Sequence, residues 1–159
     1  MKAATSVWAF DLDGTLLDTH ALIARSYRRA GAPVVSGHVM RTQTWTEWLV
    51  PMVGTEPART IWERKNELYL EGLPHVAELP LLDEVRRTEF RCAVLLTGAP
   101  RGTLQVVRER FGTSWPFVLA LEEMTRSMKY SFLTSVSKRG VYVDDQHFDV
   151  PPGWRFIRV

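Results

Sequence analysis

Residues 5–19 read TSVWAFDLDGTLLDT, and this stretch decides which fold the rest of the chain can complete. Residues 5–10 combine β-branched and aromatic side chains, a composition typical of a buried strand. The change to Asp11, Asp13 and Gly14 ends that strand, because Asp and Gly favour turns. The sequence therefore predicts a buried strand that carries two carboxylates at its carboxyl end.

Helical and strand patterns alternate from about residue 78 to the C-terminus. We expect helices at 79–89, 101–112 and 129–140, and strands at 91–97, 117–121, 141–145 and 155–159. This alternation predicts an α/β fold: a Rossmann-like, mainly parallel sheet with helices on both faces.

The intervening segment shows only helical patterns. We expect helices at 21–30, 38–50 and 58–71, with a boundary near Gly72-Leu73-Pro74. The sequence thus predicts a catalytic core made of residues 1–16 and 77–159, and a small all-helical cap at 17–76 inserted after the first strand.

Composition excludes several classes of protein. The formal net charge of +2 is too small to imply nucleic-acid binding by itself. Cys92 is the single cysteine, which excludes an intramolecular disulfide and fits a reducing compartment. No apolar run approaches the roughly 20 residues that cross a bilayer, and the N-terminus lacks the apolar region of a secretory signal. We expect a soluble, cytoplasmic protein.

Chemically reactive residues follow three of the expected strands. They are Asp11 to Thr15, then Thr97-Gly98, and then Asp144-Asp145, while Lys129 opens the helix before the last of these strands. Ligands of open parallel sheets bind at the carboxyl ends of the strands. The pattern therefore predicts one site in which these residues meet.

In these residues the chain resembles the haloacid dehalogenase superfamily. DLDGT at 11–15 is similar to the first family motif, Thr97 to the second and Lys129 to the third. Asp144-Asp145 with Asp149 is similar to the acidic fourth motif. The resemblance covers residues 5–18 and about 78–150, and the cap matches only in position and helical character.

The resemblance implies a Mg²⁺-dependent phosphatase that hydrolyses a small phosphate monoester through an aspartyl-phosphate. Asp11 would attack phosphorus, and Asp13 would protonate the leaving oxygen and then activate water. Thr97 and Lys129 would hold the transferring phosphoryl group. An aspartate at position 13 also distinguishes phosphate-ester enzymes from the dehalogenases of the family.

The resemblance also implies a set of metal ligands. Asp11 and the backbone carbonyl of Asp13 would bind Mg²⁺ together with Asp145, supported by Asp149. Asp144 would act through a water molecule. In the alternative arrangement, Asp144 binds the metal directly and Asp145 supports it.

Substrate choice is expected to come from the cap and from the loops around the phosphate. The candidates are His20, Arg41 and Trp45 in the cap and Thr15, Gly98 and Arg101 in the core. Trp45 or Trp48 can stack on a nucleobase, or both can form the small core of the cap. The substrate is expected to be a small phosphorylated metabolite, with a nucleoside monophosphate as one candidate.

Two other functions remain open from the sequence. A phosphomutase of the same family would transfer the phosphoryl group back to a sugar phosphate. A non-catalytic module with this fold would bind nucleic-acid ends and show strongly salt-dependent affinity for oligonucleotides. The sequence does not determine the oligomeric state.

Overall fold

The computed structural model describes residues 7–112, 117 and 119–159. The chain forms two compact units: unit 1 comprises Met1–Asp18 and Glu78–Val159, and unit 2 comprises Thr19–Ala77. Across the described residues, none of the helices combines the length and apolar character that crossing a membrane requires.

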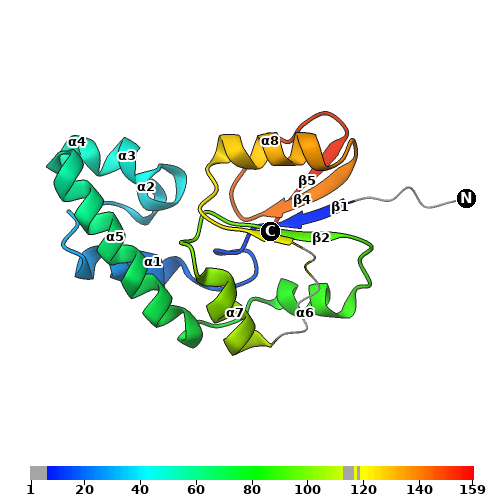
Figure 1. Ribbon diagram of the computed structural model, residues 1–159, viewed down its shortest axis with the longest axis horizontal. Helices are drawn as coiled ribbons and strands as arrows, with labels where there is room; N and C mark the ends of the chain where they lie inside the picture. Colours follow the sequence, from blue (N-terminus) through cyan, green and yellow to red (C-terminus); the bar gives the residue numbers. More distant parts are fainter. Residues whose placement is uncertain (1–6, 113–116, 118) are drawn as a thin grey trace, which may run out of the picture. The chain divides into compact units, whose positions relative to one another are not determined.

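One sheet forms the centre of unit 1. In the described part of the chain its strands are β1 (Val7–Phe10), β2 (Ala93–Leu96), β3 (Leu119–Leu121), β4 (Gly140–Asp144) and β5 (Trp154–Arg158). They lie in the order β3-β2-β1-β4-β5, and every pairing is parallel (Figure 1). Residue Phe10 of β1 pairs with Leu95 on one side and Val143 on the other, so three strands end at the same level.

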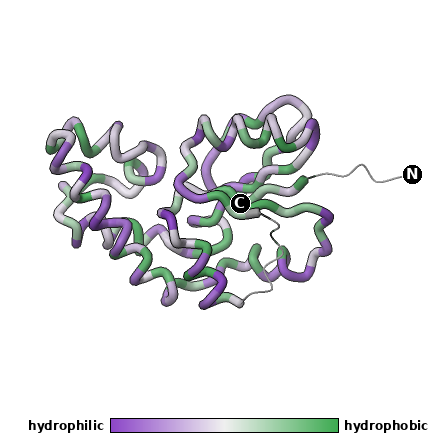
Figure 2. The backbone as a smooth tube through the Cα atoms, in the orientation of Figure 1, coloured by the Kyte–Doolittle hydropathy of each residue, from purple (hydrophilic) through white to green (hydrophobic). Residues whose placement is uncertain are grey.

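Helices cover both faces of this sheet, which confirms the predicted fold class. Helix α8 (Arg126–Val136) lies on one face, and α6 (Pro80–Arg87) and α7 (Thr103–Phe111) lie on the other (Figure 1). Side chains of β1 alternate between the two faces, as a strand requires. Ala9 packs in one cluster with Leu133 of α8, while the ring of Phe10 meets that of Phe90 at 5.6 Å. The central strands β1 and β2 consist of apolar residues, whereas the helices also carry hydrophilic residues (Figure 2).

Helix α8 differs from its sequence-based bounds at both ends. It begins at Arg126, because the Thr125 hydroxyl accepts a hydrogen bond from the amide of Met128 and caps the first turn. It ends at Val136, whereas Gly140 is the first residue of β4. The predicted helix at 129–140 was therefore wrong in its bounds, and Lys129 lies within the first turn rather than at the start.

Unit 2 is helical in all its regular structure. Its elements are α1 (His20–Arg29), α2 (Gly37–Thr42), α3 (Trp45–Trp48), α4 (Val50–Val53), α5 (Thr55–Gly72) and the 3₁₀ helix η1 (Leu73–His75). The single helix predicted at 38–50 was wrong, because three short helices replace it. A capping box restarts the helix at Thr44: its amide donates to Oε2 of Glu47 over 2.6 Å.

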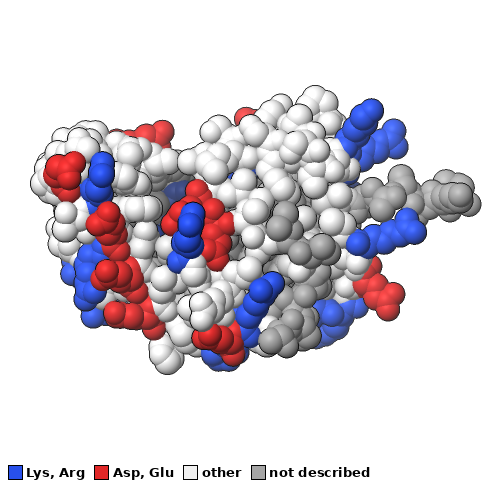
Figure 3. Space-filling view, viewed as in Figure 1, with Lys and Arg blue, Asp and Glu red and all other residues white. Residues whose placement is uncertain are grey.

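The core of unit 2 is aromatic. The rings of Tyr27 and Trp48 meet edge to face at 5.1 Å, and Lys65 is buried with its Nζ 5.2 Å from the centre of the Tyr27 ring. Acidic and basic side chains gather over the exposed side of α5 (Figure 3). Within this helix, Arg64 pairs with Glu67. The assignment of residues 17–76 as a cap remains a prediction.

Candidate active site

The central feature of the site is a buried ion pair between two distant parts of the chain. Asp11 directly follows β1, and Lys129 extends from the first turn of α8. Lys129 Nζ donates a hydrogen bond to Asp11 Oδ1 over 2.6 Å, and both side chains are at most one-tenth exposed. A buried carboxylate of this kind is held in one position and kept from bulk water.

Two further carboxylates, those of Asp144 and Asp145, lie close to this pair. One oxygen from each of Asp11, Asp144 and Asp145 lies within 4.8 Å of the others. Parallel pairing explains the convergence, because Asp11 follows β1, Asp144 ends the neighbouring strand β4, and Asp145 comes next. Carboxylate oxygens at this spacing are the hard ligands that Mg²⁺ prefers, so this group fits a divalent cation.

Burial and the neighbouring charges shift the pKa values of Asp11 and Lys129. Burial raises the pKa of Asp11 to about 8; Lys129 opposes the shift, while the carboxylates of Asp144 and Asp13 add to it. Burial lowers the pKa of Lys129, but the surrounding carboxylates, with Asp11 foremost, outweigh this effect and raise it. The carboxyl of Asp11 therefore binds a proton more readily than the carboxyl of an exposed aspartate does.

Tyr142 joins the lysine to the acidic group. Its hydroxyl donates to Asp144 Oδ2 over 2.6 Å and accepts a hydrogen bond from Lys129 Nζ over 2.9 Å. Burial, followed by the nearby carboxylates of Asp11 and Asp144, raises the pKa of Tyr142 above its ordinary value. The phenol thus stays neutral and keeps the proton that it donates.

The loop after β4 is tied to several elements. The amide of Asp145 donates to Thr15 Oγ1 over 3.0 Å, and its carbonyl accepts a hydrogen bond from Arg158 Nε over 3.2 Å. Arg126 Nη1 donates to the carbonyl of His147 over 3.0 Å. Thr15, a predicted substrate contact, therefore joins the loops after β1 and β4 in this structure.

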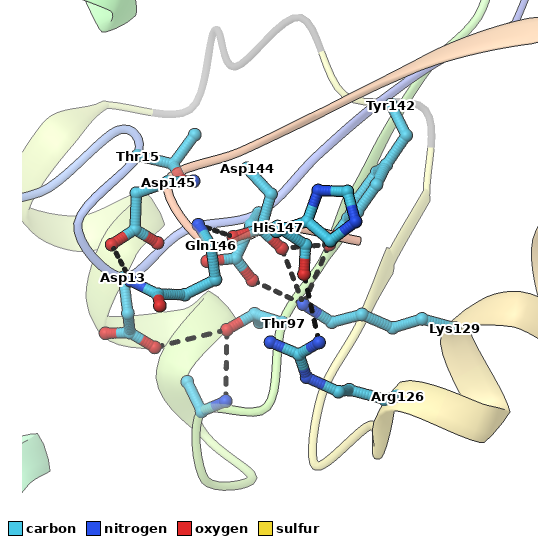
Figure 4. A network of polar contacts seen from close by, with 12 residues as sticks. Asp13, Thr15, Thr97, Arg126, Lys129, Tyr142, Asp144, Asp145, Gln146 and His147 are labelled. Carbon is cyan, nitrogen blue, oxygen red and sulfur yellow. Dashed lines mark hydrogen bonds and ion pairs between the residues drawn. The ribbon is translucent and has the colours of Figure 1, made fainter. Parts of the chain in front are cut away.

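Asp13 and Thr97 lie together at the ends of β1 and β2. Thr97 Oγ1 lies 3.4 Å from Asp13 Oδ2 and accepts a hydrogen bond from the amide of Ala99 over 3.0 Å (Figure 4). The backbone between Asp11 and Thr15 turns tightly at Gly14, whose φ of 77° favours glycine. The turn and the strand ends together bring Asp13 to Thr97.

The loop that carries Thr97 is held by the loop after β3. The carboxylate of Glu122 accepts hydrogen bonds from the amides of Gly102 and Leu104, over 2.7 and 2.5 Å, and so caps α7. The amide of Met124 donates to the carbonyl of Thr97 over 3.1 Å. At Gly98 an added Cβ would lie 3.2 Å from the carbonyl oxygen of Met124, which favours glycine there.

Two predicted site residues of unit 1 lie outside this group, and the roles of those in unit 2 remain predictions. The side chain of Asp149 is 96% exposed and lies 3.2 Å from His147 Nε2, so it is not part of the three-carboxylate group. Arg101 is exposed and lies 4.0 Å from Glu123. His20, Arg41 and Trp45 belong to unit 2, where the ring of Trp45 stacks on Trp62 at 5.4 Å.

Tyr142 and Glu122 are site residues that the sequence analysis missed. Tyr142 precedes Asp144 by two positions in β4, and residues two apart in a strand share a face. That periodicity was a usable signal for Tyr142. Glu122 gave no such signal, since its contact with the start of α7 joins residues 18 and 20 positions apart.

Solved structures with the same fold include a haloacid dehalogenase-like hydrolase and a protein assigned as a phosphatase. A protein assigned as a phosphoglycolate phosphatase from Lactobacillus plantarum superposes with a TM-score of 0.72 at 10% identity, covering 91% of this chain and 79% of that chain. CbbY from Rhodobacter sphaeroides, in complex with xylulose-(1,5)bisphosphate, gives 0.69 at 14% identity, with coverages of 88% and 77%. A haloacid dehalogenase-like hydrolase from Streptococcus pneumoniae gives 0.66 at 13% identity, with coverages of 91% and 77%.

The chain therefore has the haloacid dehalogenase fold. No protein-family model and no curated protein sequence matches it. At these identities the likeness shows the fold alone, because one fold can carry many different activities.

Proposed function

We propose that this protein is a divalent-cation-dependent phosphatase that hydrolyses small phosphate monoesters through an aspartyl-phosphate on Asp11. The observation that carries the proposal is the buried pair of Asp11 and Lys129, in which Asp11 also belongs to the three-carboxylate group with Asp144 and Asp145. A phosphate monoester is dianionic, so an anionic nucleophile can approach it only where positive charge offsets the repulsion. Lys129 supplies one such charge at the nucleophile itself.

Asp11, Asp144 and Asp145 fit a Mg²⁺ ion, and the backbone carbonyl of Asp13 is a further candidate ligand. Such an ion would supply Lewis-acid stabilisation of the negative charge on the phosphate. The exposed position of Asp149 argues against a direct role for it in this set.

The chain's own residues divide the reaction between them. Asp11 would attack phosphorus while the phosphorus–oxygen bond to the leaving group breaks, and Asp13 would donate a proton to that leaving oxygen. Asp13 would then take a proton from the water that cleaves the aspartyl-phosphate and releases inorganic phosphate. Thr97 and the amide of Gly98 would hold the phosphoryl oxygens, because they lie at the end of β2 next to Asp13.

Small phosphorylated metabolites are the substrates that we propose, with recognition by residues 17–76 acting as a cap. His20, Arg41 and Trp45 are its candidate contacts. The bound sugar bisphosphate of CbbY supports phosphorylated sugars as the first substrates to test. A cytoplasmic location stays a prediction.

The test is a panel of phosphate esters assayed for release of inorganic phosphate with Mg²⁺ and with EDTA. The panel contains sugar phosphates, a sugar bisphosphate, phosphoglycolate and nucleoside monophosphates. Asp11→Asn should abolish release, whereas Asp18→Asn, an exposed aspartate of the same segment, should not. Full activity in EDTA, or in Asp11→Asn, would contradict the proposal. Isomerisation of a sugar phosphate without net phosphate release would indicate a phosphomutase instead.

A further inference from the structure

Tyr142 occupies a position inside the site that packing alone does not explain. Its side chain is fully buried in β4, and its ring meets that of Phe148 edge to face at 4.9 Å. A phenylalanine would make the same ring contact. The hydroxyl adds hydrogen bonds to Lys129 and Asp144.

The direction of these hydrogen bonds is determined by the groups involved. An ammonium group has only donors, so Lys129 donates to the Tyr142 oxygen. The phenol has one proton, and that proton goes to Asp144 Oδ2 over 2.6 Å. The hydroxyl thus lies between a cation and an anion and satisfies both.

The Tyr142 hydroxyl lies between the ammonium group of Lys129 and the carboxylate of Asp144. Lys129 Nζ lies 2.6 Å from Asp11 Oδ1 but 3.7 Å from Asp144 Oδ2, so its close ion pair is with Asp11. The other oxygen of Asp144 accepts a hydrogen bond from the amide of Gln146 over 2.8 Å. Since each carboxylate oxygen has two lone pairs, Asp144 is held at both oxygens and still has lone pairs for a cation.

We infer that Tyr142 is a positioning residue that keeps Lys129 on Asp11 and holds Asp144 toward Asp145. This inference rests on the proposed function. Without the hydroxyl, Lys129 loses an acceptor and Asp144 Oδ2 loses a donor. The Lys129 ammonium and the Asp144 carboxylate then move toward each other, because a buried charge without a partner of opposite sign is energetically costly. Asp144 is thereby drawn away from the cation-binding group.

The experiment compares Tyr142→Phe with Tyr130→Phe, which removes a hydroxyl from an exposed tyrosine of α8. Mn²⁺ is the probe, and its dissociation constant is measured by electron paramagnetic resonance without substrate. Tyr142→Phe should weaken Mn²⁺ binding by about 10- to 100-fold, the range for losing a group that orients a metal ligand. Tyr130→Phe should leave the dissociation constant unchanged.

A double-mutant cycle with Asp144→Asn shows whether Tyr142 acts through Asp144. If it does, Tyr142→Phe should add little to the loss already caused by Asp144→Asn, whereas independent effects would add. Additive losses, or wild-type Mn²⁺ affinity in Tyr142→Phe, would overturn the inference and leave the proposed function intact. Loss of cooperative unfolding in Tyr142→Phe would overturn it as well, because the hydroxyl would then serve the fold. A wild-type chain that binds no Mn²⁺ and releases no phosphate would overturn both proposals.

Discussion

Lys129 Nζ lies 2.6 Å from Asp11 Oδ1, and this contact joins the first turn of α8 to the residue that follows β1, at the carboxyl edge of the sheet. Few other arrangements allow a carboxylate to remain buried, since an unpaired charge in the interior is costly. The ion pair with Lys129 lowers the cost of burying Asp11, and it also places the Lys129 ammonium where a phosphate dianion would approach. Stability and chemistry are therefore coupled at this position.

Lys129→Met should lower both the stability of the protein and its rate of phosphate release. Removing the cation leaves Asp11 buried among carboxylates, and breaking a buried pair costs about 3–5 kcal/mol of unfolding free energy. Phosphate release should fall by about 100-fold or more, because a charge that stabilises the transition state is lost. Urea denaturation and a phosphate assay measure the two effects. Lys138→Met, which changes an exposed lysine, should stay within about 0.5 kcal/mol of wild type.

Mg²⁺ binding should release protons. Burial raises the pKa of Asp11, so its carboxyl binds a proton more readily than an exposed aspartate does when no cation is present. A bound cation favours the ionised carboxylate and lowers this pKa, so we expect net proton release on Mg²⁺ binding near neutral pH. The release should decline as the pH rises above 8.

Calorimetric titration in two buffers of different ionisation enthalpy measures this proton release. In Asp11→Asn the release should be largely lost, while Asp18→Asn should behave as wild type. Binding enthalpies that are independent of the buffer in the wild-type protein would contradict the raised pKa of Asp11.

Substitutions of Asp13 and Asp145 should affect different properties of the enzyme: its turnover in one case and its Mg²⁺ dependence in the other. Asp13→Asn removes the proposed proton donor, so turnover should fall by about two to four orders of magnitude. The loss should be smaller for p-nitrophenyl phosphate, whose leaving group needs little protonation. Asp145→Asn should instead raise the Mg²⁺ concentration for half-maximal activity, with excess Mg²⁺ restoring part of the rate. Mg²⁺ titrations of both variants with two esters separate these effects, and exchanged phenotypes would contradict the assignment.

Glu122→Gln should loosen the loop that carries Thr97. Its carboxylate caps α7 through the amides of Gly102 and Leu104, and loss of such a cap costs about 0.5–2 kcal/mol. We expect a lower melting temperature and a higher KM for the phosphate ester, with a smaller change in kcat. Glu89→Gln, at an exposed position, is the matched control. An unchanged melting temperature in Glu122→Gln would show that the cap contributes little.

The strand-ending aspartates and the order of the elements could be predicted from the sequence. The apolar run before Asp11, the run before Thr97 and the run before Asp144 each predict a strand, and parallel strands bring their carboxyl ends to one edge. These predictions need only local patterns and a general rule of connection. The predicted α/β fold is confirmed for this reason.

Other features were decided by contacts that no local pattern encodes. A capping box at Thr44 begins a new helix within the segment predicted as one helix, which forms three short helices instead. A cap at Thr125 begins α8 at Arg126, three residues before the predicted start. The fourth acidic motif offered three aspartates, and only the folded chain shows Asp144 and Asp145 beside Asp11, with Asp149 exposed.

The sequence by itself determined which residues stand at the ends of the strands. Tertiary structure decided which of them share a site and how each is held. Asp11 and Lys129 are 118 positions apart, and Tyr142 reaches both Lys129 and Asp144 through a hydroxyl whose partners depend on the packing of α8 against β4. The physical reason is that strand formation follows from neighbouring side chains, whereas hydrogen bonds between buried polar groups exist only after distant segments have packed together.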